Sequence, residues 1–186
     1  MKLIFLPVLS LVIFLIACNN GNGNHPDNAT QTIPLINYAV KNTYPHDTTS
    51  FTEGLLVHEG LIYESTGSPE DMAQRRSLLG NIDLATGKIN IKAELDGEKY
   101  FGEGIVFLNG KVYQLTYQHK KGFIYDAKTF EKLGEFEFPS AEGWGMTTDG
   151  SHLIMSDGTN IITYLDPADF RTIRIINVHT VTGPVA

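Results

Sequence analysis

From Ile33 onward, apolar and polar residues alternate with a period near two, in short runs separated by glycines and other turn-forming residues. This alternation is typical of β-strands, and no stretch shows the apolar spacing of an amphipathic helix. The sequence therefore predicts an all-β body. We expect strands at residues 35–40, 54–58, 61–65, 78–83, 89–95, 105–108, 111–116, 122–126, 132–138, 145–148, 152–156, 161–166 and 172–178.

A short glycine motif introduces several of these strands. The sequence Phe-Gly-Glu-Gly at 101–104 and the sequence Phe-Thr-Glu-Gly at 51–54 share the aromatic residue, the acid and the last glycine. A third copy, Gly-Trp-Gly at 143–145, keeps the glycines and has tryptophan in place of the acid. The three stretches predict an internal repeat.

Each repeat closes with an aspartate that starts a turn between two strands, namely Asp83, Asp126 and Asp166. These aspartates lie about 40 residues apart, and a repeat of that length with four short strands is typical of a β-propeller blade. A β-sandwich with a similar number of strands would not explain the fixed repeat length. We therefore expect a β-propeller of four-stranded antiparallel blades.

In a propeller, the first strand of each blade lines the central channel. We expect Gly54, Gly104 and Gly145 on successive inner strands, with the acids of the motif at the channel mouth. The first repeat is longer than the others, and we place its insertion at 68–75. At about 43 residues per blade, residues 33–186 would fill roughly three and a half blades, fewer than the usual minimum of four. We therefore expect a chain that is truncated at its C-terminus.

The N-terminal residues 1–17 consist of one early lysine followed by an apolar run too short to cross a bilayer as a helix, which predicts a signal peptide. The run ends at Cys18, the single cysteine, in a context that resembles the lipobox of bacterial lipoproteins; the alternative is an incidental cysteine of an ordinary signal peptide. Residues 18–32 are rich in asparagine and glycine and predict a flexible tether. We expect a lipid-anchored, extracytoplasmic protein of the bacterial cell envelope, with its folded domain at 33–186.

The formal net charge of −7 argues against nucleic-acid binding, because the only basic pairs are Arg75-Arg76 and Lys120-Lys121. The histidines are scattered without the close pairing of a zinc site, and no serine-hydrolase or phosphate-binding motif is present. A serine or zinc hydrolase is therefore not expected.

Seven motifs, in order between residues 37 and 185, resemble those of the glutaminyl cyclases of plant and bacterial type. They are Tyr-Pro-His-Asp at 44–47, Phe-Thr-Glu-Gly-Leu at 51–55, Tyr-Glu-Ser-Thr-Gly at 63–67, Tyr-Phe-Gly-Glu-Gly at 100–104, Gln-Leu-Thr-Tyr at 114–117, Gly-Trp-Gly at 143–145 and Ser-Asp-Gly-Thr at 156–159. The resemblance implies a five-bladed propeller that converts the N-terminal glutamine of a peptide or protein into pyroglutamate and releases ammonia. It also implies that no metal or other cofactor is needed, and we expect a monomer.

The same resemblance assigns roles to individual residues. Glu103 would be the catalytic acid and base, and Phe101 and Trp144 would line the substrate pocket. Phe51 matches the family's phenylalanine, whereas two further pocket positions depart from the pattern: Glu53 stands where glutamine is commoner, and Tyr117 where tryptophan is usual. The family's later Asn-Glu-Leu-Glu motif and a following lysine have no counterpart before Ala186, so we expect the chain as given to lack part of the pocket and not to close the ring.

Cyclisation requires one group that accepts a proton and returns it, and a glutamate is suited to this when burial raises its pKa. Burial among aromatic rings such as Phe101 and Trp144 would have this effect on Glu103. In the alternative interpretation Glu103 is a solvated loop acid and Trp144 a core residue, and Glu53 and Glu64 are structural acceptors for backbone N–H groups.

The rival function is a non-catalytic propeller that presents its channel mouth to a binding partner. In that case Glu53, Glu103 and Trp144 would be recognition residues.

Overall fold

The computed structural model describes residues 35–72 and 76–185, and the chain divides into two compact units, Met1–Val40 and Lys41–Ala186. In the first unit, only residues 35–40 are described. We predicted a strand there, and this prediction was wrong: the six residues are exposed and none belongs to a strand. The apolar alternation is present, but no strand ladder includes their backbone groups, and a strand is stable only when a neighbour satisfies those groups. The predicted signal peptide, Cys18 and the tether at 18–32 lie outside the described residues.

The second unit is all-β, as predicted, and the described residues contain no helix and hence none able to span a membrane. Its strands form three four-stranded antiparallel sheets and one small two-stranded ribbon. The first sheet contains β1 (Phe51–His58), β2 (Leu61–Gly67), β3 (Ser77–Ile82) and β4 (Ile89–Leu95). The second contains β5 (Gly102–Leu108), β6 (Lys111–Thr116), β7 (Lys121–Asp126) and β8 (Lys132–Glu137). The third contains β9 (Met146–Thr148), β10 (Leu153–Ser156), β11 (Ile161–Leu165) and β12 (Thr172–Asn177), and the ribbon pairs β13 (His179–Thr180) with β14 (Gly183–Pro184).

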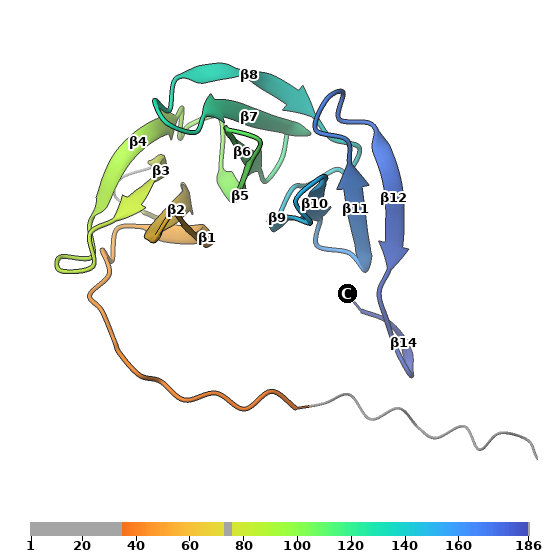
Figure 1. The fold of residues 1–186 in the computed structure, drawn as a ribbon, viewed down its shortest axis with the longest axis horizontal. Coiled ribbons are helices and arrows are strands. Elements are labelled where there is room, and N and C mark those ends of the chain that lie inside the picture. The colour runs from red at the N-terminus through yellow and green to blue at the C-terminus, as the bar shows by residue number, and fades with distance from the viewer. Residues whose placement is uncertain (1–34, 73–75, 186) are drawn as a thin grey trace, which may run out of the picture. The chain divides into compact units, whose positions relative to one another are not determined.

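Within each sheet the strands follow one another in chain order, and the three sheets are arranged side by side (Figure 1). Strands β1, β5 and β9 are innermost, and β4, β8 and β12 are outermost. Each repeat of the sequence therefore forms one sheet, which is a propeller-like arrangement. The ribbon β13–β14 was not predicted.

Gly54 lies in β1 and Gly104 lies in β5, as predicted, whereas Gly145 directly precedes β9 and is not part of that strand. Residue 104 must be glycine because β5 approaches the backbone of residues 144–146 closely at this point. The backbone N–H of Gly104 donates to the carbonyl of Trp144 at 2.8 Å, and a Cβ at this position would overlap the backbone of residues 144–146.

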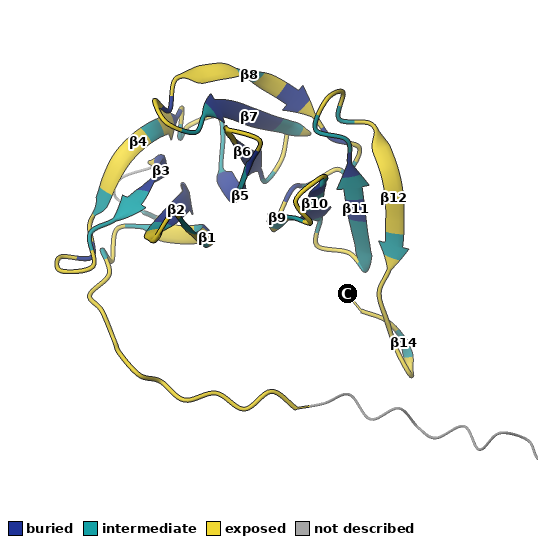
Figure 2. Ribbon diagram, in the orientation of Figure 1, coloured by how far each residue is buried: buried dark blue, intermediate teal, exposed yellow. Residues whose placement is uncertain are grey.

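Strands β5, β6 and β7 of the middle sheet are largely buried, and their successive side chains point to opposite sides and so into two cores. Ile105 packs in a core shared with the first sheet, whereas Val106 packs in a core shared with the third. The first core contains Tyr63, Leu79, Leu95, Ile105, Val112, Phe123, Tyr125 and Phe130, and the second contains Val106, Leu108, Tyr113, Leu115, Ile124, Phe136, Phe138, Leu153, Met155 and Leu165. Figure 2 shows the resulting contrast between the buried β5 and the largely exposed β12.

The turn predictions are confirmed. The carboxylate of Asp126 accepts hydrogen bonds from the backbone N–H groups of Lys128 and Thr129 at 2.8 and 2.9 Å, and Asp83 and Asp166 hold equivalent turns. The β5–β6 hairpin turns at Asn109 and Gly110, which both have positive φ (52° and 73°), as the Asn-Gly pair indicates.

Candidate active site

The two motif acids occupy equivalent irregularities of neighbouring inner strands. The pairing of β1 with β2 shifts register between Thr52 and Gly54, at Glu53. The pairing of β5 with β6 shifts between Gly102 and Ile105, at Glu103 and Gly104. A β-bulge redirects the side chain of the extra residue, and such bulges are common next to active sites. Both carboxyl groups consequently reach the same cavity.

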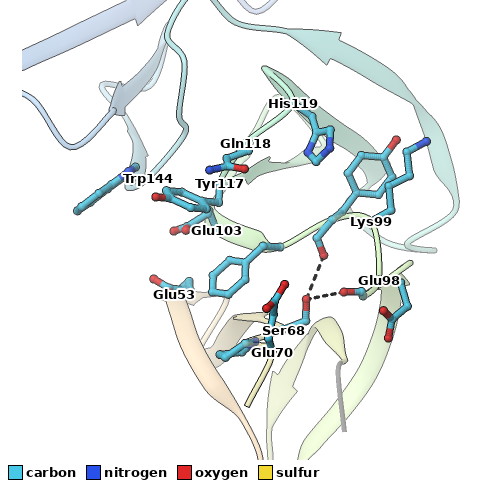
Figure 3. A pocket seen from close by; sticks show the side chains of 14 residues that line it. Glu53, Ser68, Glu70, Glu98, Lys99, Glu103, Tyr117, Gln118, His119 and Trp144 are labelled. Atoms are coloured by element: carbon cyan, nitrogen blue, oxygen red, sulfur yellow. Dashed lines mark hydrogen bonds between the residues drawn. The ribbon is translucent and has the colours of Figure 1, made fainter. Parts of the chain in front are cut away.

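This cavity has a volume of about 480 Å³. It is lined by Glu53, Ser68, Pro69, Glu70, Gly97, Glu98, Lys99, Tyr100, Phe101, Glu103, Tyr117, Gln118, His119 and Trp144. In Figure 3, Glu53, Glu103, Tyr117 and Trp144 gather on one side of the cavity, and Ser68, Glu70 and Glu98 lie on the other. The cavity thus joins the beginnings of the inner strands to the connection between β4 and β5.

Backbone hydrogen bonds hold the segments of this site together. The N–H of Tyr117 donates to the carbonyl of Phe101 at 2.9 Å, and the N–H of Gly143 donates to the carbonyl of Tyr117 at 2.9 Å. The start of β5 is further fixed by the buried hydroxyl of Ser77, which accepts from the N–H of Gly102 at 2.8 Å. The chain around Glu103 is therefore bonded to both neighbouring sheets.

Aromatic rings form one wall of the site. The ring of Phe101 makes edge contacts with Phe51 and Tyr117, each with 6.0 Å between ring centroids. Two glycines provide the space for the larger rings: a Cβ on Gly67 would overlap the ring of Phe101, and a Cβ on Gly158 would lie 2.7 Å from the indole of Trp144. Gly158 also has a φ of +75°, a conformation that side chains other than glycine rarely adopt.

Glu142 orients two of the aromatic side chains. The indole Nε1–H of Trp144 donates to Oε2 of Glu142 at 3.0 Å. The hydroxyl of Tyr117 also hydrogen-bonds to Glu142, and this bond to a carboxylate raises the pKa of Tyr117. One acid between β8 and β9 thus connects two aromatic groups on the same side of the cavity.

The electrostatics of the site are dominated by two interacting carboxyl groups. Glu103 is 6% exposed, and burial, together with the negative charge of Glu53 and a hydrogen bond between the two side chains, raises its pKa to about 9. Burial also raises the pKa of Glu53, which is half-buried. Glu103 therefore carries a proton at neutral pH and is able to donate it.

Comparison with known proteins identifies the family. A family model described as glutamine cyclotransferase matches residues 10–186. The chain belongs to the glutamine cyclotransferase family. It is 35% identical over 139 residues to a glutaminyl-peptide cyclotransferase of Arabidopsis thaliana, which covers 74% of this chain and 41% of that relative.

Among solved structures, the Myxococcus xanthus glutaminyl cyclase superimposes with a TM-score of 0.65 at 28% identity, covering 76% of this chain and 57% of that one. The chain thus spans less than two thirds of the length of either relative.

The structure places most of the site residues predicted from the sequence at this cavity. Of those that we predicted, Glu53, Phe101, Glu103, Tyr117 and Trp144 line the cavity. Phe51 does not line it but makes an edge contact with the ring of Phe101. Cys18 lies outside the described residues.

Two alternative interpretations of the sequence are wrong. Glu103 is not a solvated loop acid, because it is buried within β5. Trp144 is not a core residue, because 45% of its surface is exposed.

Glu64 does not have the alternative role of an acceptor for backbone N–H groups, because its hydrogen-bond partners are side chains. It is fully buried, and its Oε1 accepts hydrogen bonds from the hydroxyl of Thr52 and, at 3.0 Å, from Nε2 of His46. Its Oε2 has no hydrogen-bond partner. Because Thr52 directly precedes Glu53, this cluster fixes the start of β1.

Glu142 was not predicted from the sequence as a site residue. The signal that could have indicated it is its position two residues before Trp144. Among residues 35–72 and 76–185, no group of three or more histidine, cysteine, aspartate or glutamate side chains is arranged to hold a metal ion.

Proposed function

We propose that this protein is a glutaminyl-peptide cyclotransferase, which converts the N-terminal glutamine of a peptide or protein into pyroglutamate and releases ammonia. The observation that carries the proposal is a buried Glu103, with its pKa raised to about 9, that faces a cavity of about 480 Å³ beside aromatic rings, in a chain of this family. The names of the Arabidopsis and Myxococcus relatives support the same reaction.

The reaction demands little more than positioning and proton transfer. The neutral α-amine of the substrate attacks the carbon of its own side-chain amide, and the amide nitrogen leaves as ammonia once it has been protonated. In our proposal Glu103 donates this proton and then takes one from the attacking nitrogen, so it ends the cycle in its starting state.

The aromatic wall would hold the substrate folded back on itself. Intramolecular attack from a well-oriented conformation can lower a barrier by about 7–11 kcal/mol. Phe101 and Trp144 offer flat apolar surfaces that do not compete for the proton. Tyr117 would add a similar surface, with its hydroxyl directed to Glu142.

We further propose that the sheets β1–β4, β5–β8 and β9–β12 are three blades of a five-bladed propeller in a natural protein of the length of its relatives. The support is the side-by-side arrangement of three equivalent sheets and the partial coverage of both relatives. We also propose a monomer that acts outside the cytoplasm and is anchored through lipidated Cys18, on the evidence of the N-terminal sequence alone. Fatty-acid labelling of the protein and of Cys18→Ala tests the anchor.

The central test is the activity of Glu103→Gln in the protein as its gene encodes it. Ammonia release and loss of the free amino terminus are measured on a glutamine-initiated peptide, with and without a chelator. Glutamine has nearly the shape of glutamate but exchanges no proton near neutral pH, so we expect a loss of about 10²- to 10⁴-fold in kcat. Glu131→Gln, at an exposed acid between β7 and β8, is the matched control. Turnover of Glu103→Gln at the parent rate, or loss of parent activity with chelator, would refute the mechanism.

A further inference from the structure

Glu53 and Glu103 meet because their strands are packed directly against each other. Gly54 of β1 approaches β5 so closely that a Cβ on it would lie 3.0 Å from the carbonyl oxygen of Glu103. Both acids lie within the register shift of their own strand, and both line the same cavity. Figure 3 shows the two carboxyl groups on the same side of the cavity.

The two carboxyl groups hydrogen-bond to each other. An ionised carboxylate only accepts hydrogen bonds, so a bond between two such groups requires that one of them carries a proton. Glu103 is the more deeply buried of the pair, and burial disfavours the charged form. The proton therefore resides mainly on Glu103 and the negative charge on Glu53.

We propose that Glu53 is a second catalytic group of this site. Its carboxylate binds the α-ammonium group of the substrate and removes a proton from it, while Glu103 donates a proton to the leaving amide nitrogen. The inference rests on the proposed cyclotransferase function. It adds a separate base for the α-ammonium group, while Glu103 still donates a proton to the leaving nitrogen and recovers one from the ring nitrogen.

The protons balance in this scheme. The α-ammonium transfers one proton to Glu53, and the resulting amine forms a bond to the side-chain amide carbon. Glu103 donates its proton to the amide nitrogen, the bond between that nitrogen and the carbon breaks, and Glu103 recovers a proton from the new ring nitrogen. Glu53 returns its proton to the departing ammonia, which leaves as ammonium.

Few other ionisable groups act on this pair. Glu142, between β8 and β9, adds a further negative charge that favours a protonated Glu103, and Tyr117, after β6, interacts with both Glu142 and Glu103. Glu70, Glu98, Lys99 and His119 also line the cavity. Burial, the charge of Glu53 with its hydrogen bond, and the charge of Glu142 together raise the pKa of Glu103.

Glu53→Gln tests the proposal, because glutamine keeps the shape and the hydrogen bond but cannot ionise. The first measurement is an infrared or carbon-13 NMR titration of glutamate carboxyl groups without substrate. Removing a nearby like charge lowers the pKa of a carboxyl by about one unit or more. We therefore expect the highest-titrating carboxyl, Glu103, to lose its proton at a pH at least about one unit lower in Glu53→Gln. Glu53→Asp, which keeps the charge, should retain a raised value, and Glu131→Gln should match the parent.

The second measurement is the pH profile of turnover on a glutamine-initiated peptide. We expect kcat/KM of Glu53→Gln at pH 7 to fall about 10- to 100-fold. This is the effect of losing the charged hydrogen bond between the Glu53 carboxylate and the α-ammonium group of the substrate. The alkaline limb of kcat should move to lower pH together with the titration of Glu103. A purely structural role would lower the rate equally at every pH.

The outcomes separate this inference from the proposed function. An unchanged titration of Glu103 in Glu53→Gln, or an unchanged pH profile, would overturn the inference even if the parent is an active cyclotransferase. If the titration shifts as expected but the parent releases no ammonia from any glutamine-initiated peptide, the proposed function and the catalytic role of Glu53 both fail. Circular dichroism of each variant verifies folding, and Glu53→Asp supplies the comparison if Glu53→Gln does not fold.

Discussion

Gly67→Ala should damage the site by adding a single methyl group beneath its aromatic wall. Gly67 ends β2, and a Cβ at this position would overlap the ring of Phe101. The ring must then move, and with it the wall beside Glu103. Overpacking of this kind typically costs about 1–3 kcal/mol in the free energy of unfolding. For a domain of this size, each kcal/mol lowers Tm by about 2–4 °C.

Gly134→Ala is a matched control, because Gly134 lies in β8 and a Cβ there would meet no atom within 4 Å. It should leave stability unchanged or raise it by about 0.4–1 kcal/mol, since alanine restricts the unfolded chain more than glycine does. Both variants add one methyl group to a strand glycine, but only that of Gly67→Ala would meet neighbouring atoms.

A double-mutant cycle isolates the contact. Once Phe101→Ala has removed the ring, Gly67→Ala has nothing to overlap, so its cost should largely disappear. The coupling energy from urea denaturation should then lie within the 0.5–3 kcal/mol found for residues in contact. Gly67→Ala should also lower kcat/KM for a glutamine-initiated peptide. If the effects of the two substitutions on the free energy of unfolding add within about 0.5 kcal/mol, Gly67 does not provide the space for the Phe101 ring.

Two further predictions follow from the site. Glu142→Ala should release the indole of Trp144 and raise KM about 2- to 10-fold, the effect of one lost hydrogen bond. Because Trp144 is the single tryptophan, a red-shifted fluorescence spectrum would report this release, and an unchanged spectrum would contradict it. The second prediction concerns the pH dependence of stability. The pKa of Glu103 is about 9 in the folded protein, against 4.5 for an ordinary glutamate. Between pH 4.5 and 9 the unfolded chain therefore binds fewer protons than the folded protein. This group should therefore lower the free energy of unfolding as pH rises from about 4.5 to 9. Urea denaturation should show a shallower decline in Glu103→Gln, and parallel profiles would contradict the assignment.

Features encoded locally could be predicted from the sequence. The Asn109-Gly110 turn and the Asp126 turn depend on residues next to one another, and both are present. The stretch 35–40 has the same apolar alternation as true strands, but strand formation also requires a partner, which the pattern does not encode.

Long-range features of the site were harder to predict. The hydrogen bond between Glu53 and Glu103 depends on how closely β1 packs against β5, and the contact of Glu142 with Trp144 has no periodic signal. The motif predicted that the acids face a ligand, and in the structure both acids line the cavity. It did not predict that the two acids would share one proton.

The repeat explains why these particular side chains converge. Glu53, Glu103 and Trp144 each directly precede the motif glycine of an inner strand, so they occupy one structural position repeated in three sheets, and all three line the cavity. Two acids at neighbouring copies are compatible when one of them carries a proton, and burial and the charge of Glu53 raise the pKa of Glu103 to about 9. A third acid at 144 would add a negative charge beside Glu142, where the indole instead donates a hydrogen bond to that carboxylate. The substitution of tryptophan in the third copy thus removes a repulsion and provides the flat wall that an intramolecular reaction needs.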